Sequence, residues 1–300
     1  MTITVISGCR NEQDIVEPFV RHALKFCDRI IISDNSLDDS RQILEKLSDE
    51  FPDRVIVEYE NWFAFDQKST MTSLFRLAAK GWADYVVPLD TDEFISAPSR
   101  EIFEKHLESI PAGGVGTTPW RTYVSTYIHD EALRGMMYRR KAENPEYVKC
   151  IIHCAGFSPD DFVIEMGNHE VLSPNGRRVP IVRLDLPLLH FPVRSPDQFA
   201  IRIIVNWMAQ LTRDPSIATS GKATHTRNLF KLLCQNGIRR ETLFTESMGY
   251  AQGGTGPFSE KDIVHDDPQL DLTRKYSTGK AMPALQLLAR EWEKSLTGGK

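Results

Sequence analysis

Residues 2–12, Thr-Ile-Thr-Val-Ile-Ser-Gly-Cys-Arg-Asn-Glu, join a short β-branched run directly to a polar segment. The same transition recurs in RIIISDNS at residues 29–36 and in YVVPLDTDE at residues 85–93, and a further β-branched run, VIVEY, occupies residues 55–59. Short apolar, β-branched runs bounded by polar residues are typical of buried strands. We therefore expect strands over residues 2–7, 29–33, 55–59 and 85–89.

Helical patterns separate these runs, at residues 15–26, 40–50 and 68–80. In the first of them Ile15, Phe19 and Phe26 fall near one face, whereas Glu17 and Arg21 fall on the other. Alternation of buried strands with helices predicts an α/β fold whose mostly parallel sheet is covered on both faces. Sheets of this kind bind ligands at the carboxyl ends of their strands, which is where the polar segments lie.

The pattern is less regular after residue 110. Strand-like stretches occupy residues 113–127, 148–153 and 184–191, and amphipathic helical patterns occupy residues 196–211 and 281–296. We therefore expect an α/β domain over residues 1–195, followed by a helical extension over residues 196–300 that packs on it.

Composition narrows the class of protein. The net charge of -5 and the lack of a basic tract disfavour nucleic-acid binding, because phosphate neutralisation supplies most of that affinity. No apolar run reaches the length of a membrane span, and the N-terminus lacks the pattern of a signal peptide. The five cysteines are dispersed along the chain, which fits reduced thiols. We expect a cytoplasmic protein without an integral membrane segment.

The strongest chemical signal is Asp90-Thr91-Asp92-Glu93, directly after an apolar strand. Like charges a few ångströms apart repel, so such a cluster needs a positive partner. Mg²⁺ and Mn²⁺ take oxygen ligands from one or two carboxylates and complete their coordination with waters and substrate phosphates. A bound divalent cation can stabilise a departing diphosphate. An acidic turn without a metal is the alternative.

Further polar residues follow the other strands. Asn11 and Glu12 follow the first strand, and Asp34 ends the second, where a carboxylate could contact a ribose. His190 closes the last predicted strand, and Arg194 comes shortly after it. A neutral imidazole could ligate the same cation, and a guanidinium could bind phosphate oxygens. A buried structural histidine is the other reading of His190.

Taken together, C-R-N-E, D-N-S-x-D-x-S and V-P-L-D-T-D-E-F resemble segments of family-two-like glycosyltransferases of the GT-A fold. The resemblance is strongest to a bacterial subgroup with D-x-D-E-F, G-N-H and H-[FY]-P-x-R-S segments. Gly-Asn-His at residues 167–169 and the stretch from His190 to Ser195 follow in that order. The match covers about residues 1–205, and it implies a Rossmann-like, mostly parallel sheet flanked by helices.

The resemblance also implies roles. Asn11, Glu12, Asp34, Asp90 and Arg194 would bind the nucleotide-sugar donor. The cation would be Mn²⁺ or Mg²⁺, and its ligands would be Asp90, Asp92 and His190.

The catalytic base is left open among Glu93, His169 and Glu170, because no E-D pair, the usual place of the base in inverting members, follows D-x-D. An inverting transfer needs one such group to take the proton of the acceptor hydroxyl. Adjacent residues on a strand face opposite ways, so at most one of His169 and Glu170 would point into the site.

The resemblance implies an inverting, hexosyltransferase-like enzyme that moves a sugar from a nucleotide-sugar, with a UDP-sugar as the expected donor. The acceptor that it implies is a glycan or lipid-linked glycan in bacterial surface polysaccharide synthesis. If that acceptor is lipid-linked, the resemblance also implies peripheral contact with the inner membrane. Two alternatives remain: a non-catalytic carbohydrate- or nucleotide-binding module of the same fold, and a metal-dependent phosphatase with a D-x-D motif. The position of the pair on the fourth predicted strand disfavours the phosphatase.

Overall fold

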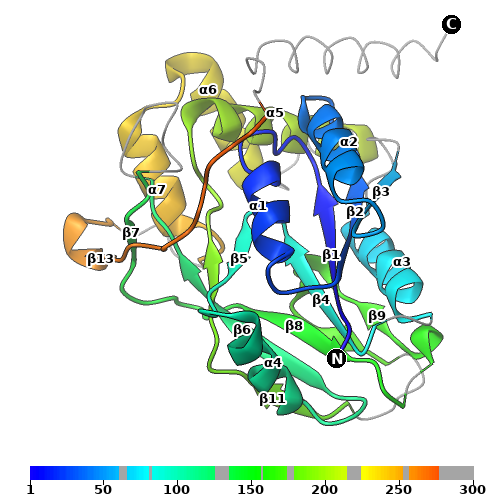
Figure 1. Cartoon of the computed structure of the whole chain (residues 1–300). Coiled ribbons are helices and arrows are strands. Elements are labelled where there is room, and N and C mark those ends of the chain that lie inside the picture. Colours follow the sequence, from blue (N-terminus) through cyan, green and yellow to red (C-terminus); the bar gives the residue numbers. More distant parts are fainter. Residues whose placement is uncertain are drawn as a thin grey trace, which may run out of the picture.

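The computed structural model describes residues 1–60, 66–80, 83–125, 135–156, 158–173, 179–214, 224–252 and 257–276. In this part of the chain, nine strands form one mostly parallel sheet with helices packed against it (Figure 1). The predicted α/β architecture, with a large and mostly parallel sheet flanked by helices, is therefore confirmed.

Four parallel strands form the N-terminal half of the sheet. β1 (Ile3–Cys9) lies between β2 (Arg29–Asp34) and β4 (Tyr85–Asp90), and β3 (Val55–Tyr59) lies beyond β2. The predicted strands are thus present, with boundaries that differ by no more than two residues.

The register of these strands brings their polar ends together. Gly8 of β1 pairs with Ser33 of β2 on one side and with Asp90 of β4 on the other. Because the strands are parallel, the segments that follow them leave the sheet at the same edge. The site described below lies at this edge, as expected for an open α/β sheet.

Alternation along the strands builds a core on each face of the sheet. Val5, Ile30 and Val87 belong to a cluster with helices α1 (Val16–Ala23) and α2 (Ser40–Glu50). Their chain neighbours point the other way, as successive strand residues must. Those neighbours, Ile6, Ile31 and Val86, pack with Met71, Leu74 and Phe75 of helix α3 (Gln67–Ala79). The sheet is therefore covered on both faces.

The second half of the sheet mixes strand directions. The order continues from β4 through β8 (Val148–His153), β6 (Val115–Thr122) and β12 (Leu188–His190) to β5 (Glu93–Ile95). β8 is antiparallel to both β4 and β6, whereas β12 is parallel to β6. β11 (Ile181–Arg183) also pairs with β6, in parallel.

Helices after the sheet begin at well-formed caps. Ser99 caps α4 (Arg100–Glu108), and Ser195 caps α5 (Pro196–Arg213) by accepting a hydrogen bond from the Gln198 amide at 3.2 Å. Pro196 stands at the start of α5, where the missing N–H of proline costs no helical hydrogen bond. Asp197, in the first turn, places a negative charge at the positive end of the helix dipole.

Two more helices follow, α6 (Thr224–Asn236) and α7 (Arg240–Gly249). Val193, Phe199, Ile203 and Leu243 form a small separate core between α5, α6 and α7. The short elements of the described chain are β7 (Tyr138–Arg140), β9 (Val163–Ile164), β10 (Val171–Leu172), β13 (Ile263–His265) and the 3-10 turns η2 (Pro159–Asp161), η3 (Met166–Asn168) and η5 (Glu260–Asp262).

Some strands begin or end at other residues than the sequence predicted. The strand expected at 184–191 contains only Leu188–His190, after Pro187, whose ring nitrogen cannot donate to a ladder. The strand expected at 113–127 ends at Thr122. The helix expected at 281–296 lies outside the described residues, and the division at residue 195 stays a prediction.

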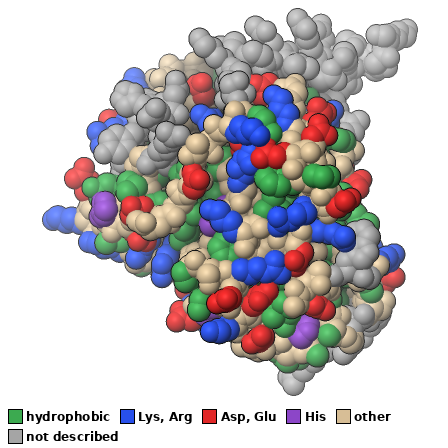
Figure 2. Space-filling view, in the orientation of Figure 1, with side chains coloured by type: hydrophobic (Ala, Val, Ile, Leu, Met, Phe, Trp, Pro, Cys, Tyr) green, Lys and Arg blue, Asp and Glu red, His purple; other side chains and the backbone are tan. Residues whose placement is uncertain are grey.

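No helix in the described ranges is long and apolar enough to span a bilayer. Figure 2 shows acidic and basic side chains interspersed over the face that it draws, without a large basic field on that face.

The last described segment, residues 266–276, runs from β13 back to α1 and α2 (Figure 1). Glu17 of α1, only 1% exposed, fastens its end: its carboxylate accepts hydrogen bonds from the backbone amides of Lys275 and Tyr276, both at 2.9 Å. Arg21 donates to the same carboxylate at 2.9 Å. Glu17 therefore ties residues 275 and 276 to the N-terminal core.

The change Glu17→Ala should lower the free energy of unfolding by about 2–3 kcal/mol, because charge-assisted hydrogen bonds are lost. Urea unfolding followed by circular dichroism measures the difference. Glu45→Ala, at an exposed position of α2, is the matched control and should change stability by less than about 0.5 kcal/mol. Equal stability of the two variants would contradict the role given to Glu17.

Candidate functional site

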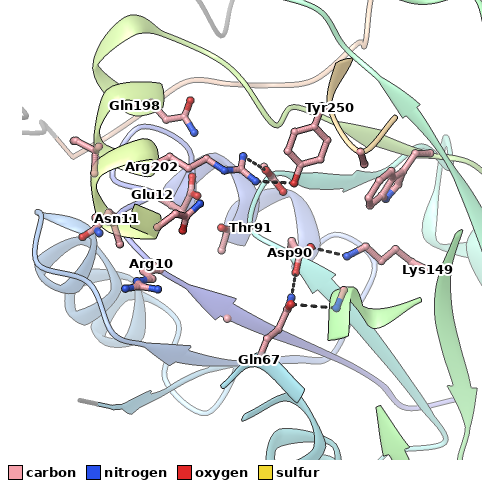
Figure 3. Close-up of a pocket in the computed structure, with 18 of the residues that line it drawn as sticks. Arg10, Asn11, Glu12, Gln67, Asp90, Thr91, Lys149, Gln198, Arg202 and Tyr250 are labelled. Carbon is pink, nitrogen blue, oxygen red and sulfur yellow. Dashed lines mark hydrogen bonds and ion pairs between the residues drawn. The ribbon is translucent and has the colours of Figure 1, made fainter. Parts of the chain in front are cut away.

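A cavity of about 350 Å³ opens at the carboxyl edge of β1 and β4 (Figure 3). Its walls come from the loop after β1, the turn after β4, strand β8, the turn η3 and helix α5. The polar and aromatic residues that line it are Arg10, Asn11, Glu12, Gln67, Asp90, Thr91, Asp92, Trp120, Lys149, His169, Gln198, Arg202, Asn206 and Tyr250. Both signs of charge therefore meet in one concave site.

Pairing of two short strands brings distant motifs together here. β5 follows Asp92 directly and pairs antiparallel with β12, so that Glu93 lies opposite His190. The Phe191 amide donates to the Asp92 carbonyl at 2.8 Å. The D-x-D-E-F segment and the stretch that begins at His190, about a hundred residues apart in the chain, are thus neighbours in space.

Protein donors occupy both oxygens of Asp90. Lys149 Nζ lies 2.6 Å from Oδ2, while Gln67 Nε2 and Asn168 Nδ2 donate to Oδ1 at 3.1 and 3.2 Å. These donors come from β8, α3 and η3, and Figure 3 shows Lys149 and Gln67 converging on Asp90 from different sides. Asp90 is held in one orientation while its side chain stays 33% exposed to the cavity.

Glu93 lies behind Asp90 and is fully buried. Its Oε1 accepts from Trp120 Nε1 at 2.7 Å and lies 3.1 Å from Lys149 Nζ, and its Oε2 accepts from the Asp90 amide at 2.9 Å. Burial raises the pKa of Glu93, and the positive charge of Lys149 works against that rise. Glu93 does not line the cavity.

Asp92 differs from Asp90 in its surroundings. Its side chain is 9% exposed and lines the cavity, but within the described chain its carboxylate has no direct hydrogen bond. His190 Nε2 lies 3.8 Å from Oδ1, and guanidinium nitrogens of Arg194 and Arg202 lie 3.9 and 4.0 Å from Oδ2. Asp92 is thus surrounded by groups that favour a carboxylate, none of them in direct hydrogen-bonding contact.

His190 is 1% exposed and stacks on the Trp120 ring, with centroids 4.2 Å apart. Burial lowers the pKa of His190 well below its usual value, which keeps the imidazole neutral. Its Nδ1 is buried without a hydrogen-bond partner in the described chain. A neutral imidazole beside a carboxylate that has no direct hydrogen bond is a suitable pair of metal ligands, and of the two only Asp92 lines the cavity.

Among the described residues, no group of three or more His, Cys, Asp and Glu side chains is arranged to hold a metal ion. A divalent cation here would therefore have two protein ligands at most among the described residues, Asp92 and His190. This number suits Mg²⁺ or Mn²⁺, which complete their coordination with waters and substrate phosphates. The third expected ligand, Asp90, already has protein donors on both oxygens.

Arg194 is completely buried and holds the loop after β1. Its guanidinium donates to both oxygens of Asp14, at 2.7 and 2.9 Å, to the Phe191 carbonyl at 2.9 Å, and to Glu12. Burial raises the pKa of Glu12, and the positive charge of Arg194 opposes this rise. Arg194 does not line the cavity, whereas Glu12 does.

Asn11 and Asp34 shape the loops at the ends of β1 and β2. Asn11 has a positive φ of 60° and accepts from the Leu37 amide at 2.8 Å. Asp34 is fully buried and accepts from the Ser36 amide at 3.2 Å and from Arg41 at 3.3 Å. Asn11 lines the cavity and Asp34 does not.

The Gly-Asn-His segment supplies the opposite wall. Gly167 has a φ of 80°, and a Cβ there would approach the His169 ring to 2.5 Å, so only glycine fits. His169 Nδ1 lies 2.7 Å from the Val148 carbonyl, which can only accept, and so Nδ1 carries the proton. Burial lowers the pKa of His169. Glu170 is exposed and does not line the cavity.

Several polar lining residues have no counterpart among the sequence predictions, among them Lys149, Arg202 and Tyr250. Arg202 donates to the Tyr250 hydroxyl and to the Pro192 carbonyl, both at 2.6 Å, and lies over the Tyr250 ring. Only Lys149 carries a sequence signal, because a lysine within the apolar run of a predicted buried strand needs a charged partner.

No protein-family model matches the chain, and no curated protein matches its sequence. Among solved structures, S. aureus TarS 1–349 in complex with UDP is 12% identical with a TM-score of 0.42, and the match covers 84% of this chain and 75% of that one. In a longer S. aureus TarS structure the match spans only 45% of that chain. The mannosyltransferase PcManGT from Pyrobaculum calidifontis, in complex with GDP-Man and Mn²⁺, is 14% identical with a TM-score of 0.40, over 98% of this chain and 80% of that one. Likenesses this slight assign neither a ligand nor a reaction.

The change Arg194→Ala should lower the free energy of unfolding by about 3–5 kcal/mol, because Glu12 and Asp14 would lose the cation that compensates for their desolvation. Guanidinium unfolding measures the loss. Arg183→Ala removes an exposed ion pair with Glu146 and should cost less than about 1 kcal/mol. Comparable losses in both variants would show that Arg194 does not anchor the loop.

Proposed function

We propose that this chain is a metal-dependent glycosyltransferase of the GT-A type, which moves a sugar from a nucleotide-sugar donor to an acceptor hydroxyl. The observation that carries the proposal is Asp92, a carboxylate that faces the cavity without a direct hydrogen bond from any described residue, beside the neutral His190. Such a pair suits a cation that brings its remaining ligands with the substrate. A diphosphate is the substrate group that meets this need.

The cavity supports a donor with a nucleoside and a diphosphate. Arg10 and Arg202 line it and offer positive charge to phosphate oxygens. Asp90 would accept a hydrogen bond from a ribose or sugar hydroxyl, while Asn11 and Glu12 would contact the nucleoside. Asp34 and Arg194 would act behind them, by holding the loops on which these residues lie.

When bound, the divalent cation would supply positive charge that stabilises the departing diphosphate. Asp92 and His190 would hold it, and Arg202 would add a fixed positive charge on the same side of the cavity. The buried indole of Trp120 would keep the His190 ring in place by stacking.

His169 is the catalytic base that the geometry favours for an inverting transfer. Its Nδ1–H donates to the Val148 carbonyl, which leaves Nε2 as the unprotonated acceptor. The lowered pKa keeps this ring neutral near pH 7. Glu93 is less suitable because its oxygens already accept hydrogen bonds, and Glu170 is exposed outside the cavity.

The donor expected from the sequence is a UDP-sugar, and the acceptor expected is a glycan or lipid-linked glycan of a bacterial surface polysaccharide. We propose both as parts of the same function.

Binding is tested by thermal unfolding with UDP, GDP and dTDP, each with Mn²⁺ and again with a chelator. A nucleotide at one hundred times its Kd should stabilise the fold by about 2.7 kcal/mol, and this gain should vanish with the chelator. Asp92→Asn should lose the metal-dependent gain, whereas the exposed change Glu45→Gln should keep it. If no nucleotide stabilises the folded wild-type protein, the proposal is wrong. The result would then favour the two alternatives from the sequence, a non-catalytic binding module or a metal-dependent phosphatase.

Catalysis is tested on the sugar form of the nucleotide that binds. His169→Gln should slow release of the nucleoside diphosphate, with water or added glycans as acceptor, by about 10²–10⁴-fold because the base is lost. Its nucleotide affinity should stay close to that of the wild type. His265→Gln, an exposed histidine on β13, is the control. Unchanged turnover in His169→Gln would remove His169 from the mechanism.

A further inference from the structure

Lys149 is a charged residue in an apolar strand. It is fully buried, and its neighbours along β8, Cys150, Ile151 and Ile152, are core residues. A buried ammonium is costly unless it is paired and hydrogen-bonded. Its Nζ meets this need by lying 2.6 Å from Asp90 Oδ2 and 3.1 Å from Glu93 Oε1. Strand β8 thus places a fixed positive charge beside Asp90 and Glu93.

Both carboxylate oxygens of Asp90 accept hydrogen bonds from protein groups. Oδ2 faces Lys149, and Oδ1 accepts from the amides of Gln67 and Asn168. Gln67 is itself oriented by the Gly167 amide, which donates to its Oε1 at 3.1 Å. A divalent cation at Asp90 would have to displace these donors and would lie close to an ammonium of the same sign.

Asp92 differs from Asp90 in its hydrogen bonding, since no described residue donates a hydrogen bond to the Asp92 carboxylate. The two carboxylates of the Asp90-Thr91-Asp92 turn are therefore not equivalent. Asp90 is hydrogen-bonded directly to its counter-ion Lys149, whereas the nearest cationic nitrogens to Asp92, on Arg194 and Arg202, lie 3.9 and 4.0 Å from its carboxylate.

We propose that Lys149 is a positioning residue that serves as the built-in counter-ion of Asp90 and Glu93 and keeps the divalent cation off Asp90. This inference rests on the proposed function, in which a cation is held in the cavity. In that function Asp92 and His190 hold the cation and Asp90 accepts a hydroxyl of the donor, and Lys149 is the group that keeps Asp90 in this orientation.

The test is binding of Mn²⁺ alone, measured by the electron paramagnetic resonance signal of free Mn²⁺ in titrations of the full chain. Asp92→Asn should weaken binding by at least about tenfold, the range seen when groups that hold a metal are changed. Asp90→Asn should leave the affinity close to that of the wild type. Equal losses in the two variants would overturn the division of roles.

Lys149→Met alone would leave buried charges unpaired, so the informative variant is Lys149→Met with Glu93→Gln. It removes one charge of each sign and exposes Asp90 to the cation. Its Mn²⁺ affinity should rise, and a further Asp90→Asn change should cancel the rise. Lys25→Met, an exposed change on the surface, is the control and should leave the affinity unchanged. A purely structural lysine would alter the melting temperature without altering Mn²⁺ affinity, which would overturn the inference.

The two proposals fail in different ways. If the wild-type chain binds no Mn²⁺ but the Lys149→Met, Glu93→Gln variant does, the metal-dependent function is wrong and the role of Lys149 is supported. If the wild type binds Mn²⁺ through Asp92 and the double variant binds it no more tightly, the function stands and the role of Lys149 is overturned. If neither binds Mn²⁺, both proposals fail.

Discussion

The antiparallel pairing of β5 with β12 is the constraint on which the candidate site depends. It sets Glu93 opposite His190 and brings the Phe191 amide to the Asp92 carbonyl. Without it, the acidic turn after β4 and the segment that leads into α5 would be unrelated surface loops. Because β12 also pairs in parallel with β6, the junction is tied into the main sheet and cannot shift by itself.

A network of buried charges surrounds this junction. On one side Lys149 compensates Asp90 and Glu93, and on the other Arg194 compensates Glu12 and Asp14. Buried ion pairs contribute little net stability, since desolvation offsets their attraction, but removing one partner is costly. Their effect here is to fix geometry. Asp92 lies between the two groups, and the protein leaves its carboxylate without a direct hydrogen bond among the described residues.

Much of the fold could be predicted from the sequence because its strands are buried on both faces. Runs such as RIII at residues 29–32 have no other stable environment than a covered sheet. The short strand β5 was beyond this reasoning, because three residues carry no usable periodicity. β12 was expected within residues 184–191, but its pairing with β5 is decided by tertiary contacts. The expected strand end at Leu89 and the observed end at Asp90 differ by one residue, so the acidic segment was located correctly.

The site was less predictable than the fold. The motif residues Asn11, Glu12, Asp90, Asp92 and His169 do line one cavity, although their roles stay proposals. Arg202 could not be found from the sequence, since an arginine on a long amphipathic helix is ordinarily a solvated side chain. Nor could the sequence reveal that Arg194 forms ion pairs with Glu12 and Asp14, because acidic partners about 180 residues away in the chain leave no local pattern.

The most direct test of the central claim is the position of the cation. Crystals of the full chain soaked with Mn²⁺ and the nucleoside diphosphate that stabilises it would locate the metal by its anomalous scattering. The account predicts a Mn²⁺ peak bound by an Asp92 oxygen and the diphosphate, with His190 beside it and Lys149 still paired with Asp90. A diphosphate bound without a metal, or a metal bound to Asp90 with Lys149 displaced, would contradict it.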